Sequence, residues 1–443
     1  MMFQKVLVAN RGEIAVRIIR ALREMGIKTV AIYSEADKEA LHTHLADESI
    51  CIGPAASAES YLNMEQIISA TVASKAEAIH PGFGFLSENA KFVEMCEKCK
   101  IAFIGPNSGL IARMGNKSEA RKTMEEAEIP IIPGTKEPLI DAKEAKEIAD
   151  KLGYPLMIKA SAGGGGKGMR IAENAEEFLS NFQTAQQEAE KNFGDNTMYL
   201  ERYIRNPRHI EVQILADKKG NVVYLGERDC SVQEHHQKLL EEAPCQALSK
   251  KLRQEMGETA ARAAKAVGYE NAGTIEFLYD KDGNYYFMEM NTRIQVEHPV
   301  TEMVTGIDLI KEQIRIAAGE PLSIKQEEAI IMGHAIECRI NAKRPGKVAE
   351  LHLPYGNGIR VDTALYQGYI VPPYYDSMIA KVIVHGKNRE EAIQKMCSAL
   401  GELIIEGIDT NLEEQYQVLM DQKFLAGQID TGFMEEHIGK SLK

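Results

Sequence analysis

The stretch Phe287-Met-Glu-Met-Asn-Thr-Arg-Ile-Gln-Val-Glu-His298 alternates strictly between apolar or small residues and strongly polar ones. In an extended backbone, alternate residues project to opposite sides. One side would carry a polar series, which consists of Glu289, Asn291, Arg293, Gln295 and Glu297. A surface strand with its polar side in water is the plain alternative. Two carboxylates, two amides and a guanidinium in one row favour instead a site for a metal ion and an anion.

The segment before this stretch strengthens the metal prediction. Thr274–Leu278 has the composition of a strand, and the turn-rich Asp280–Asn284 follows it, a pattern typical of a β-hairpin. A four-residue loop over 281–284 would place Glu276 directly opposite Glu289. Like charges opposed across two strands are destabilising, so we expect a cation between them.

Composition excludes several classes of protein. The 443 residues suffice for about three domains, and the formal charge of −13 argues against nucleic acid as a partner. The N-terminus reads as a strand and not as a signal peptide, and no apolar run is long enough to span a membrane. We therefore expect a cytoplasmic protein. The seven cysteines are scattered, and Cys96-x-x-Cys99 lies in a helical pattern, so we expect buried or free thiols in a reducing compartment.

The first 114 residues alternate short apolar runs with helical periods, which predicts a parallel sheet flanked by helices. The expected strands are Lys5–Ala9, Thr29–Tyr33, Ala78–His80 and Ala102–Ile104, and the expected helix is Glu13–Met25. Two glycine turns, Asn10–Glu13 and His80–Asn89, follow strands of this sheet. They are either ligand contacts at the carboxyl ends of strands or ordinary turns, and the sequence does not decide between the two.

Later segments continue as mixed α/β structure after a break at Ile129–Gly134. The expected elements are a helix over Asp141–Leu152, strands over Pro155–Ala160, Met169–Ala172, 199–204 and His209–Leu215, and then the hairpin. A third region begins near Ile331. Its strand His334–Asn341 would place Glu337, Arg339 and Asn341 on one face, and a strand over Met378–Val384 and a helix over Arg389–Leu400 follow.

A glycine-rich loop, Ser161–Gly168, lies between two predicted strands. It fails the Walker A pattern, but strand–glycine loop–strand is the arrangement that covers nucleotide phosphates in kinases. A flexible linker is the weaker alternative, because consecutive glycines lose much backbone entropy on folding. Lys117 and Lys159 precede this loop, and Glu276, Glu289 and Asn291 offer the oxygen ligands that magnesium prefers. Together these residues predict a nucleotide site.

These motifs, together with Ala9-Asn-Arg-Gly-Glu-Ile-Ala15, Glu337-Cys-Arg-Ile-Asn341 and Pro372-Pro-Tyr-Tyr-Asp-Ser-Met378, resemble the biotin carboxylase family of the ATP-grasp superfamily. The resemblance covers almost the whole chain. It implies an α/β (α+β) fold of three domains: a Rossmann-like N-terminal domain over 1–114, an ATP-grasp domain over 115–330 with a mobile glycine-rich lid over about 132–204, and a C-terminal biotin carboxylase domain over 331–443.

The resemblance also implies a reaction. ATP and bicarbonate would form carboxyphosphate, and biotin on a separate carrier protein would be carboxylated, with two Mg²⁺ or Mn²⁺ ions expected. No Met-Lys-Met motif is present, so the biotin carrier and the carboxyltransferase subunits are expected to be separate chains. The expected complex is acetyl-CoA carboxylase, which makes malonyl-CoA for fatty acid synthesis. The open alternatives are a subunit of another acyl-CoA or pyruvate carboxylase, a different ATP-grasp ligase, and a nucleotide-binding regulatory homologue.

Residue roles carried over from the family fall into three groups. Nucleotide and substrate contacts are expected from Lys117, Lys159, Gly164, Gly165, Gly166, Met169, Glu201, Arg202, Tyr203, Ile204, His209, Gln233, His236, Leu278, Gln295 and Val296. Metal ligands are expected to be Glu276, Glu289 and Asn291. Lys238 and Arg293 would hold bicarbonate, Glu297 would act as general base, and Arg339 would stabilise the enolate-like ureido oxygen of biotin, unless it forms a structural ion pair.

Three departures from the family pattern stand out. Ala162 replaces a glycine of the loop, and Phe83 stands where the family commonly has tyrosine, close to the expected biotin pocket. The segment after Asn341 is shorter than usual, which alters a surface expected to serve dimerisation or carrier docking. The family suggests a homodimer, with Arg20 and Glu24 as interface residues.

Overall fold

The computed structural model describes residues 2–160, 169–193, 195–235 and 237–438. The chain forms two compact units. Unit 1 contains Met1–Ile129, Arg208–Phe277 and Glu289–Lys443, and unit 2 contains Pro130–Pro207 and Leu278–Met288. The domain boundaries at residues 114 and 330 and the lid over about 132–204 stay predictions.

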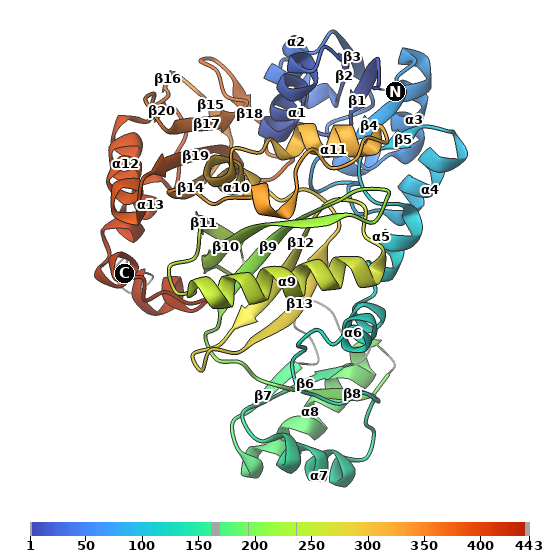
Figure 1. Ribbon diagram of the computed structural model, residues 1–443, viewed down its shortest axis with the longest axis vertical. Coiled ribbons are helices and arrows are strands. Elements are labelled where there is room, and N and C mark those ends of the chain that lie inside the picture. The colour runs from blue at the N-terminus through green and yellow to red at the C-terminus, as the bar shows by residue number, and fades with distance from the viewer. Residues whose placement is uncertain (1, 161–168, 194, 236, 439–443) are drawn as a thin grey trace. The chain divides into compact units, whose positions relative to one another are not determined.

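Unit 1 begins with the parallel sheet predicted from the sequence (Figure 1). Its strand order is β3-β2-β1-β4-β5, with β1 Lys5–Val8, β2 Lys28–Tyr33, β3 Glu48–Cys51, β4 Ala78–His80 and β5 Ala102–Phe103. The helices of this region are α1 Gly12–Glu24, α2 Leu41–Leu45, α3 Met64–Ser74, α4 Ala90–Lys98, α5 Ser108–Gly115 and α6 Lys117–Glu126. Val6, Leu7 and Val8 are fully buried, because helices cover both faces of a parallel sheet.

The two glycine turns meet because β1 and β4 are neighbouring strands. Asn10, which follows β1, donates through Nδ2 to the carbonyl oxygens of Pro81 and Phe83 at 2.7 Å each. All seven cysteines are free. Cys96 lies in α4, where burial raises the pKa of its thiol to about 12, so a metal or redox role for Cys96 is unsupported.

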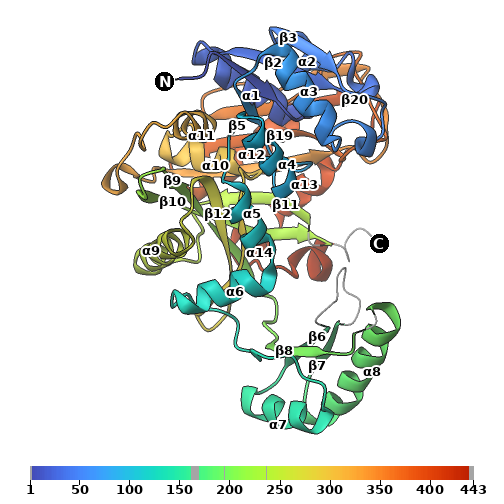
Figure 2. The ribbon, with the colours of Figure 1, turned by 90° about the vertical axis from the view of Figure 1, so that its right-hand side faces the viewer.

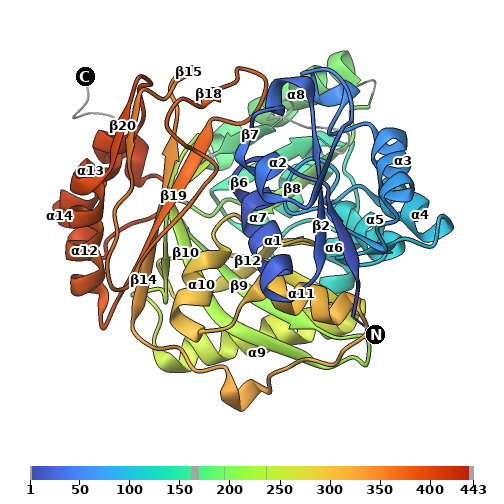
Figure 3. The ribbon, with the colours of Figure 1, turned by 90° about the horizontal axis from the view of Figure 1, so that it is seen from above.

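The second sheet has eight strands in the order β13-β12-β9-β10-β11-β14-β19-β17. Their bounds are β9 Arg208–Ala216, β10 Val222–Glu234, β11 Gln237–Ala243, β12 Asn271–Tyr279, β13 Tyr285–Asn291, β14 His334–Asn341, β17 Ile359–Thr363 and β19 Met378–Gly386. Helix α9 Lys250–Val267 packs along β9 and β10 (Figure 1). Near the other end, α10 His298–Thr305 and α12 Arg389–Glu402 cover opposite faces of β14 and β19 (Figure 3).

The remaining elements of unit 1 are short. They are α11 Leu309–Ala317, α13 Leu412–Met420 and α14 Gln422–Leu425, and the two-stranded pairs β15 Gly346–Lys347 with β18 Ile370–Val371 and β16 Glu350–His352 with β20 Ile404–Glu406. The shortened segment after Asn341 leads directly into β15. The Ala342 NH donates to the Ser377 carbonyl at 2.8 Å, which closes this segment against the start of β19.

Unit 2 is a three-stranded antiparallel sheet, β7-β6-β8, packed against two helices (Figure 2). The elements are β6 Leu156–Ala160, β7 Met169–Ala172, β8 Met198–Arg202, α7 Ala142–Leu152 and α8 Ala175–Phe193. Asp141 begins α7 as its N-cap and accepts from the NH groups of Lys143 and Glu144, as acidic caps do. The unit's apolar core lies between the sheet and the helices and includes Phe178 and Phe182.

The structure corrects two expectations for the hairpin. The Asp280 NH donates to the Asn284 carbonyl at 2.8 Å, so the turn comprises 281–283 and is one residue shorter than predicted. Strand β13 ends at Asn291, so the extended course predicted through Glu297 is wrong. The Thr292 NH donates to Glu88 Oε1 at 2.9 Å instead of to a neighbouring strand, and Glu297 is the N-cap of α10.

Candidate active site

The polar residues of the large sheet converge on one buried cluster in unit 1. Strand β9 places His209, Glu211 and Gln213 on one face, alternating with Ile210, Val212 and Ile214, as a period of two requires. All six are buried. The surface-strand alternative does not hold, because Asn291, Gln295 and Glu297 are 6%, 4% and 0% exposed.

Lys238 on β11 lies at the centre of the cluster. Its Nζ is 2.6 Å from Glu211 Oε2, 2.6 Å from Glu297 Oε1 and 3.1 Å from Glu276 Oε1. Burial works to lower the pKa of Lys238, but the Glu211 and Glu297 carboxylates raise it well above its usual value. Lys238 therefore stays an ammonium and compensates three carboxylates at once.

Glu297 is held by cations on both oxygens. Its Oε1 accepts from Lys238, and its Oε2 accepts from Arg339 Nη2 at 2.9 Å. Burial works to raise the pKa of Glu297, but Lys238, Arg339 and Arg228 hold it well below its usual value. The carboxylate is thus ionised and has a fixed direction, which are two of the requirements for a general base.

Glu276 and Glu289 form the part of the site suited to a cation. Glu276 Oε2 lies 2.9 Å from His209 Nε2, and Glu276 Oε1 accepts from Gln295 Nε2 at 3.1 Å. Burial and the nearby Glu276 carboxylate raise the pKa of Glu289, while Lys117 works to lower it. Two neighbouring carboxylates with an amide oxygen from Asn291 are the hard donors that Mg²⁺ or Mn²⁺ takes, and a divalent ion there would relieve the repulsion. The residues present therefore fit the predicted metal.

A different group of potential ligands, His209, Glu211 and Glu276, also lies within 4.8 Å. Lys238 donates to both of these carboxylates. Lys238 already neutralises both carboxylates of this group, so it is a poorer cation site than the Glu276–Glu289 pair, in which burial and the Glu276 charge raise the pKa of Glu289.

Arg293 is fixed by three side-chain acceptors and by the Ile294 carbonyl, to which its Nη1 donates at 3.2 Å. It donates through Nη2 to Asn291 Oδ1 at 2.9 Å, through Nη1 to Gln295 Oε1 at 2.6 Å and through Nε to Glu88 Oε2 at 2.8 Å. Members of the polar series therefore do meet, but through side-chain contacts and not through strand alternation. Glu88 was not predicted as a site residue, although it lies in the His80–Asn89 turn that was predicted as a possible ligand contact.

Arg339 on β14 bridges two carboxylates. It donates through Nε to Glu241 Oε1 at 2.6 Å and through Nη2 to Glu297. Burial raises the pKa of Glu241 to about 7. Arg339 therefore forms the structural ion pair that was considered as an alternative, with Glu241, and it also donates to Glu297.

Two further residues of the cluster, Arg228 and Glu211, were not predicted from the sequence. Arg228 is fully buried and donates to Glu211 Oε1 at 2.5 Å and to Gln213 Oε1 at 2.8 Å. The alternation of His209, Glu211 and Gln213 in an otherwise apolar strand was a signal for Glu211. Arg228 lies between Glu227 and Asp229 in the sequence, a pattern that indicates a solvent-exposed charged residue.

The expected nucleotide residues are divided between the units. In unit 1, Lys117 begins α6 and Gln233 pairs with Lys238 across β10 and β11. In unit 2, Lys159, Met169 and Glu201 share a face of the small sheet, because Lys159 pairs with Met169 and Met157 pairs with Glu201. Lys159 forms an ion pair with Glu201.

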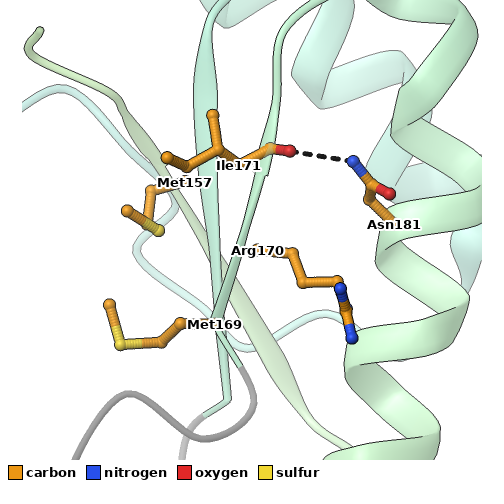
Figure 4. Close-up of a pocket in the computed structure, with 5 residues that line it drawn as sticks. All are labelled: Met157, Met169, Arg170, Ile171 and Asn181. Carbon is orange, nitrogen blue, oxygen red and sulfur yellow. Dashed lines mark hydrogen bonds between the residues drawn. The ribbon is translucent and has the colours of Figure 1, made fainter.

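A hollow at the edge strand β7 of unit 2 is lined by residues from both sides of the small sheet (Figure 4). Met157 and Met169 project to one side, and Arg170 projects toward α8, where Asn181 Nδ2 donates to the Ile171 carbonyl at 2.8 Å. Arg202 and Tyr203 donate their NH groups to the carbonyls of Pro133 and Pro155. Ile204 and Leu278 are half-buried. Gly164, Gly165, Gly166, His236 and Ala162 lie outside the described residues, so their predicted roles stay predictions.

Comparison with known proteins identifies the family. Residues 2–111 match the model for "Biotin carboxylase, N-terminal domain", residues 116–325 match "Carbamoyl-phosphate synthase L chain, ATP binding domain", and residues 337–436 match "Biotin carboxylase C-terminal domain". The chain belongs to the biotin carboxylase family. The predicted family, fold class and enzyme class, a ligase that forms a carbon–nitrogen bond, are confirmed.

Similar proteins cover nearly the whole chain. Biotin carboxylase 1 of Bacillus subtilis is 55% identical over 98% of this chain and 99% of its own length. One pyruvate carboxylase chain, from Methanothermobacter thermautotrophicus, is 51% identical over 98% and 90%. A solved structure of the biotin carboxylase domain dimer of Hydrogenobacter thermophilus 2-oxoglutarate carboxylase, in complex with MgADP, ADP and bicarbonate, is 49% identical with a TM-score of 0.89, covering 99% of this chain and 98% of that one.

None of the helices in the described ranges is both long and apolar enough to cross a membrane.

Proposed function

We propose that the chain catalyses the ATP-dependent carboxylation of biotin by bicarbonate, giving carboxybiotin, ADP and phosphate. The observation that carries this proposal is the position of Glu297, whose two oxygens are held by Lys238 and Arg339 inside a buried cluster. This arrangement places an ionised carboxylate between a cation suited to bicarbonate and a guanidinium suited to the ureido oxygen of biotin.

Nucleotide binding is assigned to residues of both units. Lys117, Lys159, Met169, His209, Gln233 and Leu278, with Glu201, Arg202, Tyr203 and Ile204, are the proposed ATP contacts among the described residues. Glu276, Glu289 and Asn291 would hold Mg²⁺ or Mn²⁺. When bound, these ions supply positive charge to the transferring phosphoryl group.

Bicarbonate is assigned to Arg293, Lys238, Gln295 and Val296. Arg293 can offer a carboxylate-like anion two parallel hydrogen bonds in exchange for its present bonds to the Asn291 and Gln295 amide oxygens. A carboxylate whose pKa is held far below its usual value is a weak base. An anion that draws Lys238 toward itself, and a biotin oxygen that draws Arg339, would weaken two of the three cations that hold down the pKa of Glu297, with Arg228 remaining. Substrate binding would thus strengthen the base only once both substrates are in place.

The biological context is proposed on the family's organisation. We assign the chain to acetyl-CoA carboxylase, with a separate biotin carboxyl carrier protein, separate carboxyltransferase subunits and a cytoplasmic location. A pyruvate carboxylase is the second candidate, favoured by the 51% identity to one chain of that enzyme. Arg20 and Glu24 are exposed on α1 and stay the proposed interface residues of a homodimer.

The test is release of ADP from MgATP with bicarbonate and free biotin each added or omitted. The proposal predicts ADP release that requires bicarbonate and is stimulated by biotin, and its loss in Arg339→Ala. ATP cleavage indifferent to both compounds would remove the proposed function. Transfer assays with purified carrier proteins of an acetyl-CoA carboxylase and of a pyruvate carboxylase then distinguish the two contexts.

A further inference from the structure

Lys381 on β19 is a fully buried lysine that the proposed reaction does not use. Its Nζ donates to the Val296 carbonyl at 2.7 Å and lies 3.1 Å from Glu13 Oε1 on α1. The Asp362 carboxylate on β17 is 4.0 Å away. Burial works to lower the pKa of Lys381, but Glu13, Glu337 and Asp362 raise it. Lys381 is therefore charged, and its charge is directed at a main-chain oxygen.

That oxygen belongs to the peptide group that leads into Glu297. A peptide group is planar, so fixing the Val296 carbonyl also fixes the Glu297 nitrogen and limits where the Glu297 side chain can point. Lys381 pairs directly with Arg339 across β19 and β14, and Arg339 holds the carboxylate of the same residue. Two neighbouring cations on one face of the sheet thus hold Glu297, one through its main chain and one through its side chain.

Packing alone does not account for a lysine at this position. A buried ammonium loses its hydration and needs a compensating carboxylate, which Glu13 provides here. A methionine of similar length would fill the space without losing the hydration of a charge and without needing a compensating carboxylate. The feature that methionine cannot supply is the hydrogen bond to the Val296 carbonyl.

We propose that Lys381 is a positioning residue for carboxylation, acting through Glu297. This inference rests on the proposed function, in which Glu297 is the base. Loss of the Lys381 bond would let the Val296–Glu297 peptide rotate and would displace the carboxylate from the bicarbonate proton. A small displacement of a reacting group costs up to about 100-fold in rate.

The test compares kcat for biotin carboxylation in Lys381→Met and in Glu13→Gln/Lys381→Met, which removes the ion pair as a whole and protects folding. We expect a fall of about 10- to 100-fold with the KM for ATP unchanged. Lys395→Met is the matched control, because Lys395 also donates to a main-chain carbonyl, that of His385 at 2.6 Å. Its kcat should stay at the wild-type value.

A second readout separates positioning from a structural role. In a Glu297→Asp background the carboxylate is already displaced, so Lys381→Met should cost less than about 3-fold there, because groups that act as a unit are not additive. The same loss in both backgrounds, or an unchanged kcat in both variants that lack Lys381, would overturn the inference. A Glu297→Asp enzyme with the full wild-type rate would instead contradict the assignment of Glu297 as base.

Discussion

Replacing Lys238 with methionine removes an ammonium shared by three buried carboxylates. Its Nζ lies 2.6 Å from Glu211, 2.6 Å from Glu297 and 3.1 Å from Glu276. Removing one partner of a buried ion pair costs about 3–5 kcal/mol. Arg339 remains beside Glu297, so we expect the free energy of unfolding at about pH 8 to fall by an amount in this range and not by three times that amount.

The assay is urea denaturation followed by circular dichroism, since the chain has no tryptophan. Midpoints are compared at equal denaturant slope. Lys218→Met is the control, because the Lys218 side chain is 51% exposed and lies 3.5 Å from Glu270. Removing such a surface charge should change stability by less than about 0.5 kcal/mol.

The destabilisation by Lys238→Met should shrink as pH falls. In the wild type the pKa values of Glu276 and Glu297 are lowered. The stability that these two carboxylates contribute to the fold is therefore present above the pKa of a glutamate in the unfolded chain, about 4.3, and is lost only as pH falls below it. Without Lys238 these pKa values rise, so the variant's carboxylates take up protons at a higher pH than those of the wild type, and this uptake recovers part of the lost stability as pH falls.

His209 acts in the same direction. Burial works to lower its pKa, but Glu276 raises it, and Lys238 opposes that rise. A raised histidine pKa stabilises the fold at low pH, and this stabilisation is lost as pH increases. Removing Lys238 raises the pKa of His209 further and so increases the stabilisation at low pH. A stability loss no larger than that of Lys218→Met, or a loss that does not shrink with pH, would refute the account of the cluster.

Three other predictions concern binding. Glu289→Gln should weaken Mn²⁺ binding in the presence of ADP by at least about 10-fold, measured by calorimetry; unchanged affinity would remove Glu289 from the metal site. Glu88→Gln frees Arg293 and should raise the KM for bicarbonate about 10-fold with the KM for ATP constant, whereas an equal rise in both would indicate general damage. Phe83→Tyr restores a hydroxyl and should lower the KM for free biotin by about 2- to 10-fold, and no change would place Phe83 away from biotin.

Much of the fold could be predicted because short periodic segments keep their structure in the whole chain. Strand β14 and helix α7 match the predicted ranges within a residue, since period and capping residues are local properties. The course of the chain after Asn291 could not be predicted. The alternation continues in the sequence, but Thr292 bonds to Glu88, 204 residues away, and no local pattern reveals such a contact.

The cluster shows the same division. Glu211 was detectable as a polar residue alternating with buried aliphatic ones in β9. Arg228 was not, because its partners, Glu211, Gln213, Thr274 and Thr301, come from three other elements. Lys238, Arg339 and Glu297 were therefore predicted as site residues, while the contacts through which the two cations hold Glu297 came from the tertiary structure.

The most direct test of the central claim measures carboxybiotin formed from labelled bicarbonate, together with ADP, in the wild type and in Glu297→Ala. The account predicts equal amounts of carboxybiotin and ADP in the wild type, and in Glu297→Ala a loss of carboxybiotin by about 100-fold or more at unchanged MgATP affinity. Carboxybiotin formation by Glu297→Ala at the wild-type rate would contradict it.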